Sequence, residues 1–139
     1  MTLQIDVLET SFQEIAPHGE AFVAAFYARL FAQFPQTRAF FTTTDMKEQE
    51  KKLLGALLLV IQNLRKPDVL APALKGLGQR HAAYGVRPEH YPIVGAVLLD
   101  TFAAFLGEGW TPARREAWAQ AYEAVSALML AGDPALAVV

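Results

Sequence analysis

Prolines and glycines divide this chain into segments of helical length, and this spacing constrains the fold more than any other feature of the sequence. Helices are predicted over about residues 3–15, 18–34, 45–65 and 88–106 and from 112 to near 132, with a compact stretch at 35–41. Apolar residues recur within them at helical spacing, as in the row Tyr91, Val94, Leu98, Phe102 and Phe105. No segment shows the period-two alternation of a strand. The sequence therefore predicts an all-α fold.

Local signals mark where several of these helices begin and end. Asp45 and Glu48 have the spacing of a capping box at the start of the helix 45–65. Thr111 followed by Pro112 is typical of an N-cap and a first helical position. Gly85 is expected to end the segment 67–84, whose own helical signals are weakened by two prolines and two glycines. The helix 45–65 is apolar nearly all round beyond residue 53, so we expect it to lie deep in the core.

The apolar content of the chain is high for its length. Hydrophobic residues make up 53% of the 139 residues and charged residues only 19%, which excludes intrinsic disorder and favours one domain over residues 1–139. An oligomer interface, a membrane or a large apolar ligand could each account for this surplus. The longest apolar run, 53–61, is too short to span a membrane, and the N-terminus carries Asp6 and Glu9 where a secretory signal has basic residues. A cytoplasmic protein is expected.

Charge and cysteine content exclude further classes. The net charge is −2 and no basic stripe is visible along the chain, which argues against nucleic acid as a partner. The absence of cysteine excludes disulfides, thiolate metal sites, a cysteine nucleophile and thioether-linked cofactors. The three histidines have no paired spacing, so a closed zinc site is not expected. His18 and His90 lie at turns, where exposure is the expectation.

The third histidine differs because it falls on an apolar helical stripe. This stripe consists of Leu70, Leu74, Leu77, His81 and Tyr84. A histidine on such a face is either a core residue bonded to a nearby carbonyl or a ligand. Gly76 and Gly78 loosen the same segment and would let a planar group approach closely, which favours the second interpretation.

Five stretches of the chain form a recognisable series. They are FYARLF at 26–31, Pro35 with Phe40 and Phe41, QEKKL at 49–53, QRHAAYGV at 79–86 and HYPIVG at 90–95. In this order they resemble the single-domain bacterial haemoglobins related to the globin domain of flavohaemoglobins. The resemblance covers nearly the whole chain. It implies a three-over-three globin fold around haem b.

The resemblance also implies how one side of the haem would be held. His81 would be the proximal iron ligand, with its second ring nitrogen bonded to a carbonyl near Leu77. Tyr91 matches a tyrosine that supports this imidazole in the flavohaemoglobin group. Asp133 falls where that group carries Glu, and the shorter side chain implies weaker support and less peroxidase-like character. As a residue at a helix end, Asp133 could equally be solvated.

On the distal side, Tyr27 and Gln49 match the family's two polar residues, and Leu53 would share their face. Their alternative environment is solvent, since Gln49 lies between Glu48 and Glu50. The residues expected to pack against the porphyrin are Phe41, Leu77 and Val86, with Phe40 as a one-residue alternative to Phe41. Two hydrogen-bond donors, each worth about 1 kcal/mol, would slow O₂ release and favour tight binding.

Three functions remain open at this point. The first is reversible binding of O₂, and also of CO and NO, by a monomer or weak homodimer. The second is an NO dioxygenase or a peroxidase-like enzyme. A chain of 139 residues leaves no room for a flavin domain, so this enzyme would need an external reductase. The third is a haem-free helical signalling regulator.

Overall fold

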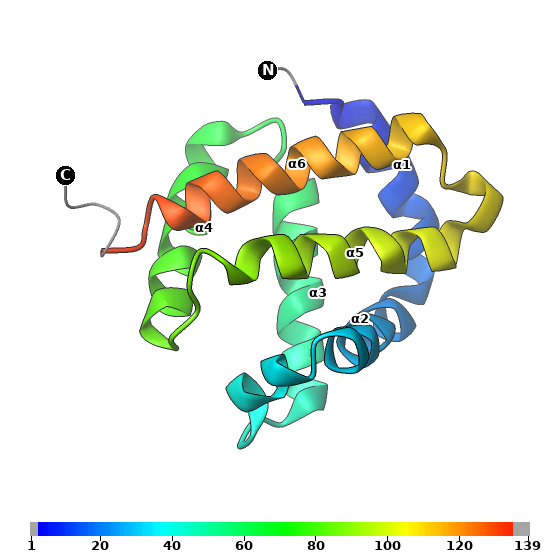
Figure 1. Ribbon diagram of the computed structural model, residues 1–139. Helices are drawn as coiled ribbons and strands as arrows, with labels where there is room; N and C mark the ends of the chain where they lie inside the picture. Colours follow the sequence, from blue (N-terminus) through cyan, green and yellow to red (C-terminus); the bar gives the residue numbers. More distant parts are fainter. Residues whose placement is uncertain (1–2, 135–139) are drawn as a thin grey trace.

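The structure, a computed structural model, describes residues 3–134 as helices joined by short turns (Figure 1). The α-helices are α1 (Ile5–Ile15), α2 (Gly19–Gln33), α3 (Met46–Gln62), α4 (Pro67–Ala83), α5 (His90–Leu106) and α6 (Pro112–Leu130). Three 3-10 segments lie between them: η1 (Ala16–His18), η2 (Pro35–Phe41) and η3 (Gly107–Gly109). No strand occurs among residues 3–134, so the all-α prediction is confirmed.

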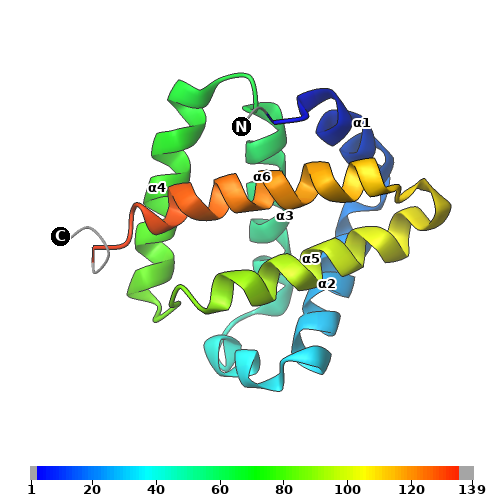
Figure 2. The ribbon, with the colours of Figure 1, turned by 45° about the horizontal axis from the view of Figure 1, so that its top comes forward.

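The helices form two layers of three. Helices α3 and α4 run antiparallel through a short connection, and α5 and α6 cross in front of them in Figures 1 and 2. Helix α2 packs on both α3 and α5, and α1 packs on α6, α5 and α3. Helix α6 also packs on α4, which joins the pair in front to the pair behind. This is the three-over-three arrangement that the resemblance implies.

Aromatic side chains fill the main core between these layers. Phe22 and Phe102 are fully buried, with ring centroids 4.8 Å apart. The Phe102 ring also lies 4.2 Å from that of Trp118. The indole of Trp118 donates a 2.8 Å hydrogen bond to the Ser11 hydroxyl, so its one polar group is satisfied inside the core.

The residues predicted to cap the helices are largely confirmed. Thr111 accepts a 3.2 Å hydrogen bond from the Arg114 N–H, as expected for an N-cap. Asp45 likewise accepts from the Lys47 N–H at 3.0 Å. The capping box is only half formed, because the Glu48 carboxylate contacts the Lys51 ammonium at 3.3 Å.

Helix α4 ends in a Schellman motif directly after the histidine of the apolar stripe. Gly85 has φ +91°, its N–H donates to the Ala82 carbonyl, and the Val86 N–H donates to the His81 carbonyl, each at 3.0 Å. The placement of Tyr84 on the apolar stripe is wrong. Its side chain is 74% exposed, because the regular helix has already ended at Ala83.

The segment with weak helical signals forms a full helix, because it packs on α6. Leu70 and Leu74 are buried against Met129, and this contact stabilises α4 despite Pro72 in its interior. A Cβ atom on Gly78 would lie 1.8 Å from the Met129 carbonyl oxygen. Gly78 therefore lets the α4 and α6 backbones approach, which corrects the expectation that it admits a planar ligand.

Helix α3 is less buried than its sequence predicts, and the expectation that it lies deep in the core is wrong. None of its residues is fully buried. Its apolar side chains, among them Leu53, Leu57 and Leu58, remain half-buried. The reason is that α3 packs on α2 and, with fewer contacts, on α1, while periodicity alone cannot show how many neighbours cover a helix.

One stretch of the described residues is long and apolar enough to cross a membrane by length and composition alone. It is His90–Gly109, which contains α5 and is longer than the run 53–61. In this fold α5 contacts α1, α2 and α6, and its residues Val97, Leu98 and Phe102 are buried in the main core. These contacts are those of a core helix.

Candidate functional site

The position of His81 is set by the last turns of α4. Its Nδ1 lies 2.9 Å from the Leu77 carbonyl oxygen, where the sequence predicts an acceptor. The Nδ1 atom therefore carries the proton, which leaves Nε2 as the ring nitrogen with a free lone pair. Burial lowers the pKa of His81, the Leu77 carbonyl acts in the opposite direction, and the charge of Arg80 lowers it further. A neutral imidazole with an available nitrogen is a ligand suited to iron.

The two polar residues expected on the distal side are in direct contact. Tyr27 is only 6% exposed on α2, and the amide nitrogen of Gln49 on α3 donates a 3.0 Å hydrogen bond to its hydroxyl. Both residues therefore avoid the solvated environment that was their alternative. Burial raises the pKa of Tyr27, so its phenol stays protonated at neutral pH. Because the hydroxyl oxygen accepts from Gln49, its own proton remains available to a third group.

The aromatic residues beside this pair come from α2 and η2. The Phe41 ring lies 5.6 Å from that of Tyr27 and 5.6 Å from that of Phe31. Phe40 instead is 37% exposed and contacts the His90 ring at 5.0 Å. Phe41 rather than Phe40 is therefore the residue next to the Tyr27–Gln49 pair.

The remaining apolar residues expected at the site are all half-buried. Leu53 follows Gln49 by one turn of α3 and packs against the main core cluster. Leu77 packs against the cluster of α4 and α6 side chains that contains Leu74. Val86 lies directly after the end of α4, where its N–H bonds the His81 carbonyl.

Tyr91 and Asp133 lie close enough to interact. Burial raises the pKa of Tyr91, and the negative charge of Asp133 raises it further. Asp133 is half-buried and shares the lining of a pocket of about 400 Å³ with Ala82 and Val86. The fold therefore brings Asp133 to the end of α4 rather than leaving it as a solvated helix end.

The role of Tyr122 on α6 was not predicted from the sequence. Its hydroxyl donates a 2.6 Å hydrogen bond to the Tyr91 carbonyl, which ties the start of α5 to α6. A Cβ atom on Gly95 would lie 2.6 Å from the Tyr122 ring, so the glycine makes room for it. Gly95 inside an otherwise apolar helix is the one signal that could have indicated this contact.

Gln49 and His81 lie at the same end of the α3–α4 pair. Each is roughly 20 Å along its helix from the short connection, at about 1.5 Å of rise per residue. Since the two helices run side by side in opposite directions, both residues reach the end away from that connection (Figure 2). The His81 imidazole and the Tyr27–Gln49 pair therefore lie toward the same end of this helix pair.

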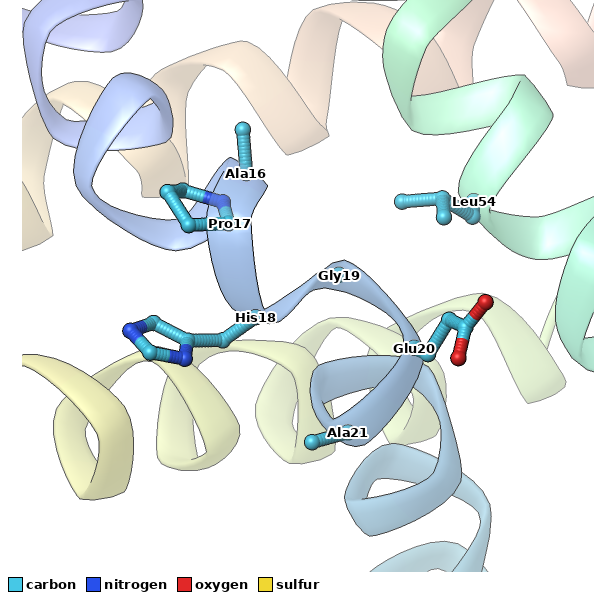
Figure 3. A pocket seen from close by; sticks show the side chains of 7 residues that line it. All are labelled: Ala16, Pro17, His18, Gly19, Glu20, Ala21 and Leu54. Carbon is cyan, nitrogen blue, oxygen red and sulfur yellow. The ribbon is translucent and has the colours of Figure 1, made fainter.

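Another hollow on the described surface lies elsewhere. It has a volume of about 470 Å³ and is formed by η1, the start of α2 and Leu54 (Figure 3). His18 lines it and is exposed, as predicted for a turn histidine. Neither Tyr27 nor His81 contributes to it. This hollow is wide open to solvent and offers no metal-ligating group besides His18 and Glu20, so it is not part of the candidate site.

The chain was compared with known proteins. The Globin family profile matches residues 24–129. Among curated relatives, a flavohemoprotein of Rhizobium meliloti is 36% identical over 119 residues, which cover 84% of this chain and 30% of the relative. A flavohemoprotein of Bacillus subtilis is 31% identical over 124 residues, which cover 88% of this chain and 31% of the relative. The chain thus spans about a third of the length of these relatives.

Solved structures show the same likeness. A bacterial globin from Campylobacter jejuni superposes with a TM-score of 0.83 at 26% identity and covers 96% of each chain. An engineered carbene transferase, built on a candidate nitric oxide dioxygenase of Rhodothermus marinus, has a TM-score of 0.84 at 28% identity. It covers 98% of this chain and 96% of its own. The match of the family profile, together with the three-over-three arrangement of helices, shows that this chain belongs to the globin family.

Proposed function

We propose that this globin holds haem b with His81 as the axial iron ligand and binds O₂ reversibly, together with CO and NO. The observation that carries the proposal is the 3.0 Å contact between Gln49 and Tyr27 at the end of the helix pair where His81 keeps Nε2 available. When bound, haem supplies an iron atom with a sixth position for one diatomic gas.

The residues around His81 fit the proximal side of such a group. The Leu77 carbonyl holds the imidazole in one tautomer and one orientation, so that Nε2 is the ligating atom. Tyr91 and Asp133 lie near each other at the end of α4 and would support the ring from outside. His81 offers a single ligand to a metal, and no cluster of three His, Asp or Glu residues occurs in residues 3–134. A single protein ligand suits a metal whose other ligands come from a macrocycle.

The apolar residues fit the faces of a flat hydrophobic group. Leu53 on α3 and Leu77 on α4 are half-buried apolar side chains on the two helices that would enclose it, and Phe41 and Val86 extend this lining. Covering such side chains gains about 25 cal/mol for each Å² removed from water. This burial would account for part of the apolar surplus of the sequence.

On the distal side, Tyr27 and Gln49 act as donors to the bound gas. The Tyr27 O–H and the Gln49 N–H would donate hydrogen bonds to a bound gas that carries partial negative charge, and each such bond would stabilise it. The Gln49 amide is a poorer ligand for iron than an imidazole, so it would leave the iron accessible to the gas.

Removing either donor is expected to speed O₂ release. We expect Tyr27→Phe and Gln49→Leu each to raise the O₂ dissociation rate about fivefold, the equivalent of one hydrogen bond of about 1 kcal/mol. Flash photolysis of the ferrous protein under mixed CO and O₂ measures this rate. Tyr84→Phe is the matched control, since this tyrosine is 74% exposed, and it should leave the rate unchanged. Wild-type rates in both distal variants would show that these side chains do not contact the gas.

A second candidate function is NO dioxygenation. It is favoured by the structural likeness to the Rhodothermus marinus protein and by the flavohemoprotein relatives, which are about three times as long as this chain. In this case the iron would have to be reduced after each turnover, so the function requires an electron donor. Stopped-flow mixing of the oxygenated protein with NO decides between the two functions. A dioxygenase loses its oxygenated spectrum within milliseconds. A slow loss would reject NO dioxygenation and retain O₂ binding as the function.

A further inference from the structure

Charge is distributed very unevenly between two parts of this globin. Residues 35–87, which run from η2 to the turn after α4, contain nine Lys and Arg against four Asp and Glu, a net charge of +5. The remainder of the chain contains three Lys and Arg against ten Asp and Glu, a net charge of −7. The overall charge of −2 therefore conceals an uneven distribution of charge along the chain.

The basic side chains of residues 35–87 lie on the surface. All nine are exposed. Four of them form ion pairs within 4.0 Å, for example Lys47 with Glu50 and Arg87 with Glu89. Five have no such carboxylate partner among residues 3–134. These five, called the basic face below, are Arg38, Lys52, Lys66, Lys75 and Arg80.

Three residues of the basic face lie beside residues of the candidate haem site. Arg80 precedes His81 in sequence, and its charge acts on the imidazole. Lys52 lies next to Leu53 on α3. The Arg38 guanidinium lies 4.8 Å from the centre of the Phe31 ring, which in turn contacts Phe41. Helices α3 and α4, which carry three of the five cations, lie side by side in both views of the fold (Figures 1 and 2).

We propose that the basic face docks an electron-transfer protein that has an acidic surface near its redox group. This inference rests on the proposed haem function, which needs ferric iron to be returned to the ferrous state. In the docked complex one electron leaves the partner's carrier, which is oxidised by one electron, and ferric iron becomes ferrous; no atom or proton is exchanged. The net −7 of the remaining chain would repel the same partner, which would favour contact through the basic face.

The test uses a flavodoxin, an acidic one-electron carrier, as the probe. Binding of fluorescently labelled flavodoxin to the purified haem-loaded protein is followed by fluorescence anisotropy at low ionic strength. We expect Lys52→Glu and Lys75→Glu each to weaken binding at least fivefold and to slow reduction of the ferric protein by reduced flavodoxin to a similar degree. Raising the ionic strength should weaken wild-type binding and shrink the difference between the variants.

Arg115→Glu is the matched control, because it reverses one exposed cation on α6 with the same change in net charge. It should change binding less than twofold. Equal weakening by Arg115→Glu, or wild-type binding by both lysine variants, would overturn the docking surface. The wild type could also bind phosphatidylglycerol vesicles more tightly than flavodoxin, with both lysine variants weakening that binding. This result would overturn the docking of a protein and indicate a membrane as the partner.

Failure of this proposal can be separated from failure of the haem function. Dithionite reduces the ferric protein without docking, so its rate and the subsequent O₂ spectrum report on the haem site alone. If dithionite reduces the protein normally and the two lysine variants bind flavodoxin as the wild type does, only the docking surface is rejected. Loss of the haem spectrum in the wild type rejects the proposed function, whatever flavodoxin does.

Discussion

Replacing His81 with alanine is expected to remove haem from this protein. The imidazole is the one side chain proposed to bond the iron, and its Nδ1 contact with the Leu77 carbonyl directs Nε2 toward that role. Loss of outer partners of a metal ligand costs about 10–100-fold in metal affinity, so loss of the ligand itself should cost at least about 100-fold. The absorbance of haem relative to protein after gel filtration measures the effect, and we expect it to fall to near zero.

Two controls make the His81 experiment specific. His18→Ala changes an exposed histidine away from the site and should retain a full complement of haem. Free imidazole added to the His81→Ala protein should restore part of the haem binding, because it can occupy the space of the missing ring. A His81→Ala protein that keeps haem with a wild-type spectrum would contradict the assignment.

Gly78→Ala is expected to cause a large loss of stability. The added Cβ would lie 1.8 Å from the Met129 carbonyl oxygen and 2.5 Å from its carbon, so a backbone rather than a flexible side chain stands in the way. Overpacking usually costs about 1–3 kcal/mol, and we expect the upper end or more because α4 and α6 would have to separate. Urea unfolding of the purified protein measures the free energy.

Gly76 provides the matched control on the same helix. A Cβ atom there would meet only the Arg80 guanidinium at 3.7 Å, which is an ordinary contact. Alanine is a better helix former than glycine by about 0.8–1.0 kcal/mol, so Gly76→Ala should stabilise the protein. Destabilisation by both substitutions to the same extent would show that the approach of α4 to α6 is not what makes Gly78 necessary.

The parts of the fold that follow from local chemistry could be predicted from the sequence. The Thr111 cap, the Asp45 cap and the Gly85 ending depend on residues within a few positions of one another, and all three are present. Burial could not be predicted in the same way. Helix α3 is apolar on nearly all sides, yet its exposure depends on which helices cover it, and this is a property of the whole fold.

Two features of α4 could not be predicted from its own residues for the same reason. Its helical structure depends on packing of Leu74 against α6, which outweighs the cost of Pro72 inside the helix. The need for Gly78 depends on where the backbone of Met129 passes. Neither fact can be read from residues 67–83 alone, because each depends on a helix that begins almost thirty residues later.

The candidate site was predicted mainly from resemblance rather than from physical chemistry. Spacing placed His81 on a helical stripe but left a core role open for it. The contact of Gln49 with Tyr27 joins residues 22 positions apart on different helices, and no local pattern indicates it. The basic face could not be predicted for a related reason, since its five cations are scattered over residues 38–80 and come from η2, α3, α4 and the turn before α4.

The absorbance spectrum of the purified protein after addition of hemin tests the central claim most directly. We expect one haem per chain, with a Soret band that is sharper and shifted relative to free hemin. Reduction should give the spectrum of five-coordinate ferrous haem, and O₂ should convert it to an oxygenated form that reverts under vacuum. A spectrum that remains that of free hemin, with no response to reduction and O₂, would contradict the account.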